Sequence, residues 1–449
     1  MRPSLTSGHR SPFHAPCEAR PLLEGSSRRG EGVVSFMFPE VWSPQVGLGR
    51  ALFVLSDALD LVGVDDVFHG KRVAWMARHL VDTLGQPELR QDVHHASLVH
   101  DCGVSSTALH GLLARRITSE DGHSEAGARL VSGFGPLAHL ADVIRYHHTP
   151  WPQLRDLDER TAKLTNLIFL ADRMDVLQAS VKTDDAGALR RLVRERLLNP
   201  WARLFAPDLV DAARMVLEEP EALFMMRSQA REPLTMPVED AQRQLRPADA
   251  RGLALLFAQT VDAKSPFTAR HSNGVAALAL HLADASGRLR GSREALEIAA
   301  LLHDLGKLRV PDEVLDKPGP LDARECTAMR RHVTESRLIL GRIGGFEAIA
   351  RVAGMHHELL DGSGYPDGLR GEEIPIEAQF ITVADIFQAL AQDRPYRKAL
   401  APRQILAVLE GIVRAGRLDG GLVRILAEDM ELSWGLARVG EHSVAPAAA

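Results

Sequence analysis

The sequence predicts an all-α protein built from two tandem copies of one helical domain. Apolar residues recur three and four positions apart over most of the chain, which is the spacing of amphipathic helices. Long alternating runs of β-branched residues, which are typical of strands, do not occur. The same polar residues also appear twice in the same order. A chain of 449 residues is long enough for two or three domains, each with its own core.

The bulk composition is that of a soluble globular protein, with 45% hydrophobic and 25% charged residues. The net charge of −6 gives no indication of a nucleic-acid polymer or an anionic membrane as partner. The three cysteines stand far apart and form no CxxC pair, so they indicate neither a zinc ribbon nor a disulfide framework. No apolar run approaches the roughly 20 residues that span a bilayer. We therefore expect a cytoplasmic protein.

Composition and periodicity divide the chain into five segments. Residues 1–45 are rich in Ser, Gly, Pro and Arg without periodicity, and are expected to form a disordered arm. Helical periodicity begins with "ALFVLSDALDLV" and "KRVAWMARHLVDTL" and defines a first domain over 46–225. The Pro- and Gln-containing segment 226–248 is interpreted as a linker. A second helical domain is predicted over 249–436, followed by a disordered tail over 437–449.

Histidine and aspartate residues mark the repeat. A His-Asp dipeptide follows the opening histidine by 31 residues in the first block and 32 in the second. A further histidine precedes a His-His pair by 24 residues in both blocks, and an Ala-Asp follows in a helical pattern. Any one of these residues alone would more often be an ordinary core or helix-end residue, but their repeated order argues against that. The two sets are His69, His100, Asp101, His123, His147, His148 and Asp172, and His271, His303, Asp304, His332, His356, His357 and Asp385.

Such a set predicts a two-metal centre. Five imidazoles and two carboxylates exceed the roughly four ligands of a tetrahedral zinc, and suit two metals about 3.5–4 Å apart with a bridging carboxylate. Imidazole and carboxylate without thiolate favour iron, manganese or another borderline transition metal. Neighbouring residues on a helix point about 100° apart, so we expect the His356–His357 pair at a helix end. The residues that follow, Gly362, Gly364 and Pro366, are expected to stop that helix.

Cationic residues accompany the second set. Lys307 follows Asp304 by three residues, and the segment "DRPYR" carries Arg394 and Arg397. A lysine and two guanidinium groups beside a two-metal centre are typical of a phosphate-binding site. The second block is therefore predicted to hydrolyse a phosphodiester, with His303, Asp304 and Lys307 as catalytic residues.

The motifs "HDLGK", "HHELLDGSGYP", "GLRGEEIP", "VADIFQAL" and "DRPYR" together resemble the HD-GYP subgroup of the HD phosphohydrolase superfamily, over about 255–430. The resemblance implies an α-helical domain that uses two divalent metals, typically iron or manganese. Its expected function is hydrolysis of cyclic di-GMP to linear pGpG, or on to GMP. Two alternatives stay open: a cyclic GMP–AMP phosphodiesterase, and a catalytically weak sensor or adaptor that binds a cyclic dinucleotide.

The resemblance also implies a role for each site residue. It places His271, His303 and Asp385 on one metal and His332, His356 and His357 on the other, with Asp304 as the bridge. Lys307 resembles the lysine that assists at the scissile phosphate, and Arg394 and Arg397 resemble the pair that contacts phosphate. Gly364, Tyr365 and Pro366 are expected to shape the substrate pocket and a docking surface for a partner such as a diguanylate cyclase domain. A homodimer is left open.

Several positions depart from the family pattern. Family members with a third metal have a glutamate where this chain has Phe267, so two metals and the linear dinucleotide are expected. Ser265 and Gln388 replace common aspartates, which is expected to weaken substrate affinity. In the first block, Val104 replaces the lysine and "HHTPWPQL" replaces the Gly-Tyr-Pro loop. That block is expected to bind metal without a phosphate clamp, as a regulatory or structural half or as a hydrolase of a smaller substrate.

Overall fold

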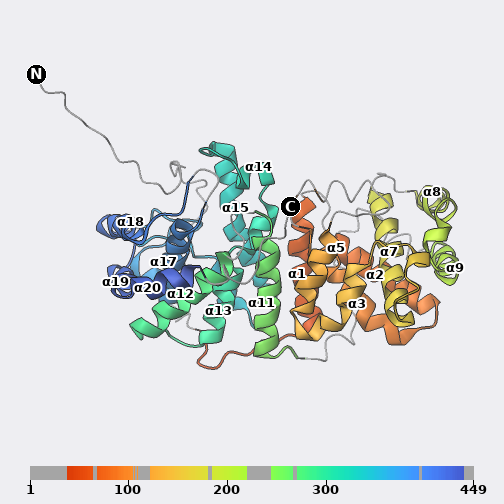
Figure 1. The fold of residues 1–449 in the computed structure, drawn as a ribbon, viewed down its shortest axis with the longest axis horizontal. Helices are drawn as coiled ribbons and strands as arrows, with labels where there is room; N and C mark the ends of the chain where they lie inside the picture. The colour runs from red at the N-terminus through yellow and green to blue at the C-terminus, as the bar shows by residue number, and fades with distance from the viewer. Residues whose placement is uncertain are drawn as a thin grey trace, which may run out of the picture.

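The computed structural model confirms the all-α prediction. It describes residues 38–63, 68–104, 106, 109, 122–179, 185–219, 244–265, 271–393 and 397–438. Within these ranges the chain forms helices and turns, and its β-type pairings are isolated bridges, such as Gly47–Gln244, and not strands. Two helical halves lie side by side, the N-terminal half in red to yellow and the C-terminal half in green to blue (Figure 1). None of the described helices is both long and apolar enough to cross a membrane.

The N-terminal half consists of α-helices of 5 to 21 residues with short segments of 3-10 or π-helix between some of them. They are α1 (Leu48–Asp60), η1 (Leu61–Gly63), α2 (His69–Thr83), η2 (Pro87–Leu89), α3 (Arg90–Val99), α5 (His123–Ser132), η3 (Gly135–Leu140), α6 (Ala141–Arg145), η4 (Trp151–Gln153), α7 (Glu159–Ala179), α8 (Ala186–Val193), η5 (Arg194–Leu198), η6 (Ala202–Leu204) and α9 (Pro207–Val216).

Among the described residues, the C-terminal half repeats this order and has α14 and α20 in addition. It comprises α11 (Pro247–Asp262), α12 (His271–Ser286), α13 (Arg293–Leu302), η8 (Leu305–Arg309), α14 (Asp312–Leu315), α15 (Ala323–Leu340), α16 (Glu347–Ala353), η9 (Gly371–Glu373), α17 (Ile376–Ala391), α18 (Pro402–Arg414), α19 (Gly420–Glu428) and α20 (Met430–Ala437).

Equivalent helix pairs build the core of each half. In the C-terminal half α12 packs against α13 and α17, and in the N-terminal half α2 packs against α3 and α7. The α12–α17 contact buries apolar side chains such as Leu278, Phe380 and Phe387 completely. Each such side chain contributes roughly 1.5–3 kcal/mol of burial free energy. This packing brings the start of α12 next to the middle of α17, where the first and last residues of the predicted ligand set lie.

The predicted disordered arm is wrong for its last residues. Phe38 and Trp42 are buried, at 3% and 5% exposure. The indole N–H of Trp42 donates to the Gly345 carbonyl at 2.8 Å, and its ring packs edge-to-face on Phe346. A segment with little helical character can still be anchored when two large aromatic side chains find a core, and composition does not reveal this. Residues 1–37 lie outside the described residues.

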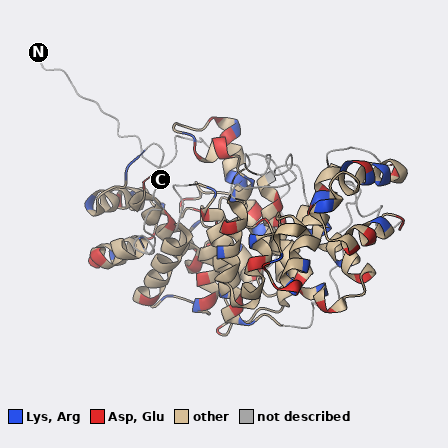
Figure 2. Cartoon of the chain, turned by 45° about the vertical axis from the view of Figure 1, so that its right-hand side comes forward, with Lys and Arg blue, Asp and Glu red and all other residues tan. Residues whose placement is uncertain are grey.

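The halves meet along α1, α11, α15 and η8. Helix α1 contacts α15 and η8, while α11 contacts α5 and η3 of the other half. Most of the predicted linker lies outside the described residues, but its last two positions belong to α11, which begins at Pro247. Figure 2 shows acidic and basic residues interspersed along the helices of both halves, in keeping with the small net charge.

Candidate metal centre

The predicted ligands of the C-terminal half lie on several helices and on the turns between them, and they converge on one point. His271 is the first residue of α12, and His303 directly follows α13, which begins with a Ser292 cap on the backbone N–H of Ala295. His332 lies in α15, whose start is fixed by a capping box between Asp322 and Glu325. The described residues thus bring together His271, His303, Asp304, His332, His356, His357 and Asp385, with donor atoms of each subgroup within 4.8 Å of one another.

Asp304 stands at the centre of this set and divides it in two. Its Oδ2 atom lies 3.3 Å from His271 Nε2 and 3.2 Å from His303 Nε2. Its Oδ1 atom lies 3.3 Å from His332 Nε2 and 3.8 Å from His356 Nε2. One carboxylate therefore presents one oxygen to each histidine pair, which is the arrangement of a ligand that bridges two cations.

The histidine rings are oriented by hydrogen bonds on their outer nitrogens. Nδ1 of His303, His332 and His356 donates to the main-chain carbonyl three residues earlier, at 2.6–2.7 Å. This bond fixes the tautomer that leaves the Nε2 lone pair directed at the centre. Burial lowers the pKa of His332 to about 4 and that of His356 to about 3, so both rings are neutral, as metal binding requires.

His271 is oriented differently, by a side chain. Its Nδ1 donates to Gln388 Oε1 at 2.5 Å, and the amide of Gln388 donates in turn to the Ala437 carbonyl. Burial opposes the charged form, but bonds to Asp304 and Asp385 raise the pKa of His271 to about 9. Gln388 was expected to affect substrate affinity, yet its contact is with a predicted ligand. The sequence holds a signal for this contact, because Gln388 follows Asp385 by three residues, as Asp175 follows Asp172 in the first half.

The helix before the His-His pair ends earlier than predicted. Helix α16 stops at Ala353, with Gly354 as its C-cap, so His356 and His357 lie in the following turns rather than in the last helical turn. The N–H of Gly354 still donates to the Ala350 carbonyl, but the N–H of Met355 donates to the Val352 carbonyl, only three residues earlier, so the helix has ended well before Gly362 and Pro366. The same order recurs in the N-terminal half, where α6 ends at Arg145 before the His147–His148 pair.

The Gly-Tyr-Pro loop lies directly against the centre. The Tyr365 ring packs on His357 with ring centroids 4.8 Å apart, and the Arg330 guanidinium lies 4.9 Å from the Tyr365 centroid. A Cβ on Gly364 would lie 2.4–2.6 Å from the backbone at 357–359, so this close approach requires glycine. The buried Glu358 carboxylate accepts backbone N–H bonds from residues 367–369 and holds the loop. Sequence reasoning gave Glu358 no role.

The predicted cationic residues are placed unequally. Lys307 hydrogen-bonds Asp304 Oδ2, and together with His303 it holds the pKa of that buried carboxyl well below its usual range. Arg397 donates to the carbonyls of Ala389 and Leu390 at the end of α17, so its predicted contact with phosphate stays a prediction. Arg394 and Phe267 lie outside the described residues.

The second predicted set also converges, in the N-terminal half. Asp101, His123, His147 and His148 form one group of donor atoms, and His69, His100 and Asp172 form another. Val104, at the position of the lysine, is buried and apolar.

Known proteins share this arrangement. The HD domain family matches residues 67–180 and 256–422. The chain is 36% identical to 3'3'-cGAMP-specific phosphodiesterase 1 of Vibrio cholerae, over 86% of this chain and 92% of the relative. It is 43% identical to the cyclic di-GMP phosphodiesterase response regulator RpfG of Xanthomonas campestris, over 33% of this chain and 38% of that protein. A crystal structure of a cyclic GMP-AMP specific phosphodiesterase of V. cholerae superposes with a TM-score of 0.57 and 26% identity, over 86% and 98% of the two chains. This chain belongs to the HD-GYP family of phosphodiesterases, with a second HD domain before the HD-GYP domain.

Proposed function

We propose that the C-terminal half is a metal-dependent phosphodiesterase that hydrolyses 3'3'-cyclic GMP–AMP to its linear dinucleotide. The observation that carries the proposal is the position of Asp304, whose two oxygens face two different histidine pairs at 3.2–3.8 Å. His332 and His356 are neutral, so they do not neutralise Asp304, and a carboxylate that faces two histidine pairs suits a ligand that bridges two cations.

The residues fit two divalent metal ions. Asp304 Oδ1 is buried and has no hydrogen-bond partner, a condition that is costly unless a cation satisfies it. His271, His303 and Asp385 would hold one ion, His332, His356 and His357 the other, with Asp304 between them. The donor set contains imidazole and carboxylate and no thiolate, which favours iron or manganese. Such ions supply positive charge at the phosphoryl oxygens and lower the pKa of a water.

The chain's own residues position the substrate around this centre. Lys307 lies with 15% of its side chain exposed beside Asp304, where its ammonium faces both the carboxylate and solvent. We assign to Lys307 the stabilisation of the negative charge that develops on the phosphoryl group when a phosphodiester is cleaved. The Tyr365 ring forms one wall beside His357, and its buried hydroxyl has a raised pKa because of burial, so it stays neutral.

The choice of dinucleotide follows from the extent of the similarities. A relative that matches across both HD domains is specific for 3'3'-cGAMP, and so is a similar solved structure. Relatives that are cyclic di-GMP phosphodiesterases, such as RpfG and a Thermotoga maritima protein, match about a third of this chain. Cyclic di-GMP is the second candidate, because those matches are 40–43% identical.

The test compares both dinucleotides in one assay. Protein loaded anaerobically with iron, or with manganese, is incubated with each, and linear products are separated by chromatography. We expect kcat/KM for 3'3'-cGAMP to exceed that for cyclic di-GMP by at least about tenfold, or about 1.4 kcal/mol of transition-state stabilisation. A reversed ratio supports the second candidate. Tight binding of either dinucleotide without turnover contradicts the proposal and favours the sensor or adaptor role.

A further inference from the structure

The N-terminal half repeats the bridged geometry at slightly longer distances. Asp101 Oδ2 lies 3.5 Å from His100 Nε2 and 3.8 Å from His69 Nε2. Asp101 Oδ1 lies 3.7 Å from His147 Nε2 and 3.8 Å from His123 Nε2. One carboxylate again presents one oxygen to each of two histidine pairs.

Several polar atoms of this cluster are buried without a hydrogen bond. They are Asp101 Oδ1, His100 Nε2 and both ring nitrogens of His148. A buried polar group without a partner is destabilising, so four such atoms in one cluster are unexpected for a half that serves only as a scaffold. His100 and His147 donate their Nδ1–H to the carbonyls of Ser97 and Ile144 at 2.7 and 2.6 Å. Their Nε2 lone pairs are thereby aimed at the cluster, as in metal-binding histidines.

A second layer of side chains supports the first histidine. His69 Nδ1 donates to Asp175 Oδ2 at 2.8 Å, and Asp175 also accepts from Arg72 and Gln178 at 2.7 Å. A carboxylate behind a histidine raises its basicity as a ligand and fixes its ring. Asp172 keeps its Oδ1 towards His69 Nε2 at 3.5 Å, while Arg173 holds its Oδ2. Four of the predicted ligands, His69, His100, His147 and His148, are therefore held by bonds on their outer nitrogen or have no hydrogen bond on either nitrogen.

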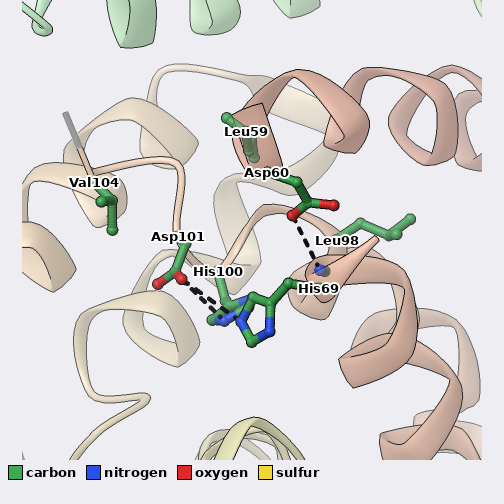
Figure 3. A pocket seen from close by; sticks show the side chains of 8 residues that line it. Leu59, Asp60, His69, Leu98, His100, Asp101 and Val104 are labelled. Atoms are coloured by element: carbon green, nitrogen blue, oxygen red, sulfur yellow. Dashed lines mark hydrogen bonds and ion pairs between the residues drawn. The ribbon is translucent and has the colours of Figure 1, made fainter. Parts of the chain in front are cut away.

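The cluster opens into a small pocket next to the junction of the two halves. Figure 3 shows His69, His100, Asp101 and Val104 around it, with Asp60 accepting the N–H of Gly70 at 3.2 Å. The side chain of Asp101 is 20% exposed, against 3% for Asp304, so solvent ions reach it more easily.

The same corner of the N-terminal half contacts the catalytic half. Helix α1 ends at Asp60, and η1, which follows it, packs against η8, the segment that carries Lys307. One turn earlier, the buried Asp57 pairs with Lys71 of α2 and with Arg342 at the end of α15. The start of α2, where His69 lies, is therefore tied through α1 to both α15 and η8.

We propose that the N-terminal half holds a second pair of divalent transition-metal ions, bridged by Asp101, and that this centre holds α1 and η1 against η8 of the catalytic half. The first part rests on the geometry of the ligands and on their buried oxygen and nitrogen atoms that have no hydrogen bond. The second part rests on the contacts of Asp57, Asp60 and η1. Neither part depends on which dinucleotide is hydrolysed.

The first experiment measures metal content per chain by mass spectrometry of the full-length protein, after loading with manganese and desalting. The matched variants are Asp101→Asn and Asp304→Asn, one for each centre. We expect about four ions per wild-type chain, two for each bridged pair, and loss of about half of them in either variant. A wild-type chain with about two ions, or an Asp101→Asn chain with wild-type content, overturns the proposal. Circular dichroism checks folding, and His100→Gln replaces Asp101→Asn if that chain does not fold.

The second experiment follows amide hydrogen exchange in the Asp304→Asn chain, in which only the N-terminal centre can load fully. Added manganese is expected to slow exchange in η1 and η8 as well as around His69. The double variant Asp101→Asn/Asp304→Asn is the control and should show no such change. Protection that stays confined to α2 and α3 contradicts the link to η8. The hydrogen-exchange measurement needs no substrate, so its result is independent of whether the protein hydrolyses either dinucleotide.

Discussion

Gln388 offers a prediction whose size can be worked from the structure. Its side chain is fully buried, and its Oε1 accepts the Nδ1–H of His271 at 2.5 Å across 117 positions of sequence. Gln388→Leu keeps the volume but leaves that N–H without an acceptor, at a cost of about 1–3 kcal/mol. A free-energy cost of 1.4 kcal/mol corresponds to a tenfold change in affinity. Loss of a group that hydrogen-bonds a metal ligand typically lowers metal affinity about 10–100-fold, and we expect the same range here.

The assay is competition for manganese with a fluorescent chelator, read as an apparent Kd. Gln379→Leu is the matched control, because it removes a glutamine from the same helix whose bond is to the Ile374 carbonyl, away from the centre. We expect the control to bind metal like the wild type. If Gln388→Leu also binds metal with wild-type affinity, then the His271–Gln388 bond does not orient a ligand and the reasoning is refuted.

Three further predictions concern the C-terminal centre. Gly306→Ala places a Cβ 2.2 Å from the His332 carbonyl and should lower the free energy of unfolding by about 1–3 kcal/mol in urea titrations, whereas Gly319→Ala, in open space, should not. Lys307→Met should lower kcat about 100-fold in steady-state assays, with Lys317→Met, a surface pair to Glu325, near wild type. Chelation should lower the Tm in thermal scans and added manganese should restore it, because bound ions stabilise only the folded chain; an unchanged Tm argues against structural occupancy.

The ligand set could be predicted from sequence because the chain carries two copies of it. Each histidine alone was ambiguous, but its counterpart at the same offset was not, and the structure brings both sets together. The all-α fold class could be predicted because apolar residues recur three and four positions apart over most of the chain. The exact end of α16 could not be predicted, since the helix already ends in the turn at Gly354, before the more conspicuous glycines downstream.

Other features depend on contacts between distant parts of the chain. The anchoring of Trp42 on Gly345 joins residues 303 positions apart, in a segment whose composition suggests disorder. The role of Glu358 is visible only once the loop that it holds has folded back on it. The link of Asp57 to Arg342 spans 285 positions and depends on how the two halves pack. Local sequence patterns carry no information on such pairs.

The most direct test of the account is the pair of variants Asp304→Asn and Asp101→Asn in the cyclic-dinucleotide assay, with metal content measured on the same samples. The amide keeps the side-chain shape but removes a charge that interacts with each cation by about 4 kcal/mol at roughly 4 Å and an effective dielectric constant near 20. We predict that Asp304→Asn loses the C-terminal ions together with at least about a thousandfold in kcat/KM, and that Asp101→Asn retains those ions. Hydrolysis that survives in Asp304→Asn would contradict the assignment of catalysis to the Asp304 centre, and loss of the C-terminal ions in Asp101→Asn would contradict the assignment of a separate bridging aspartate to each half.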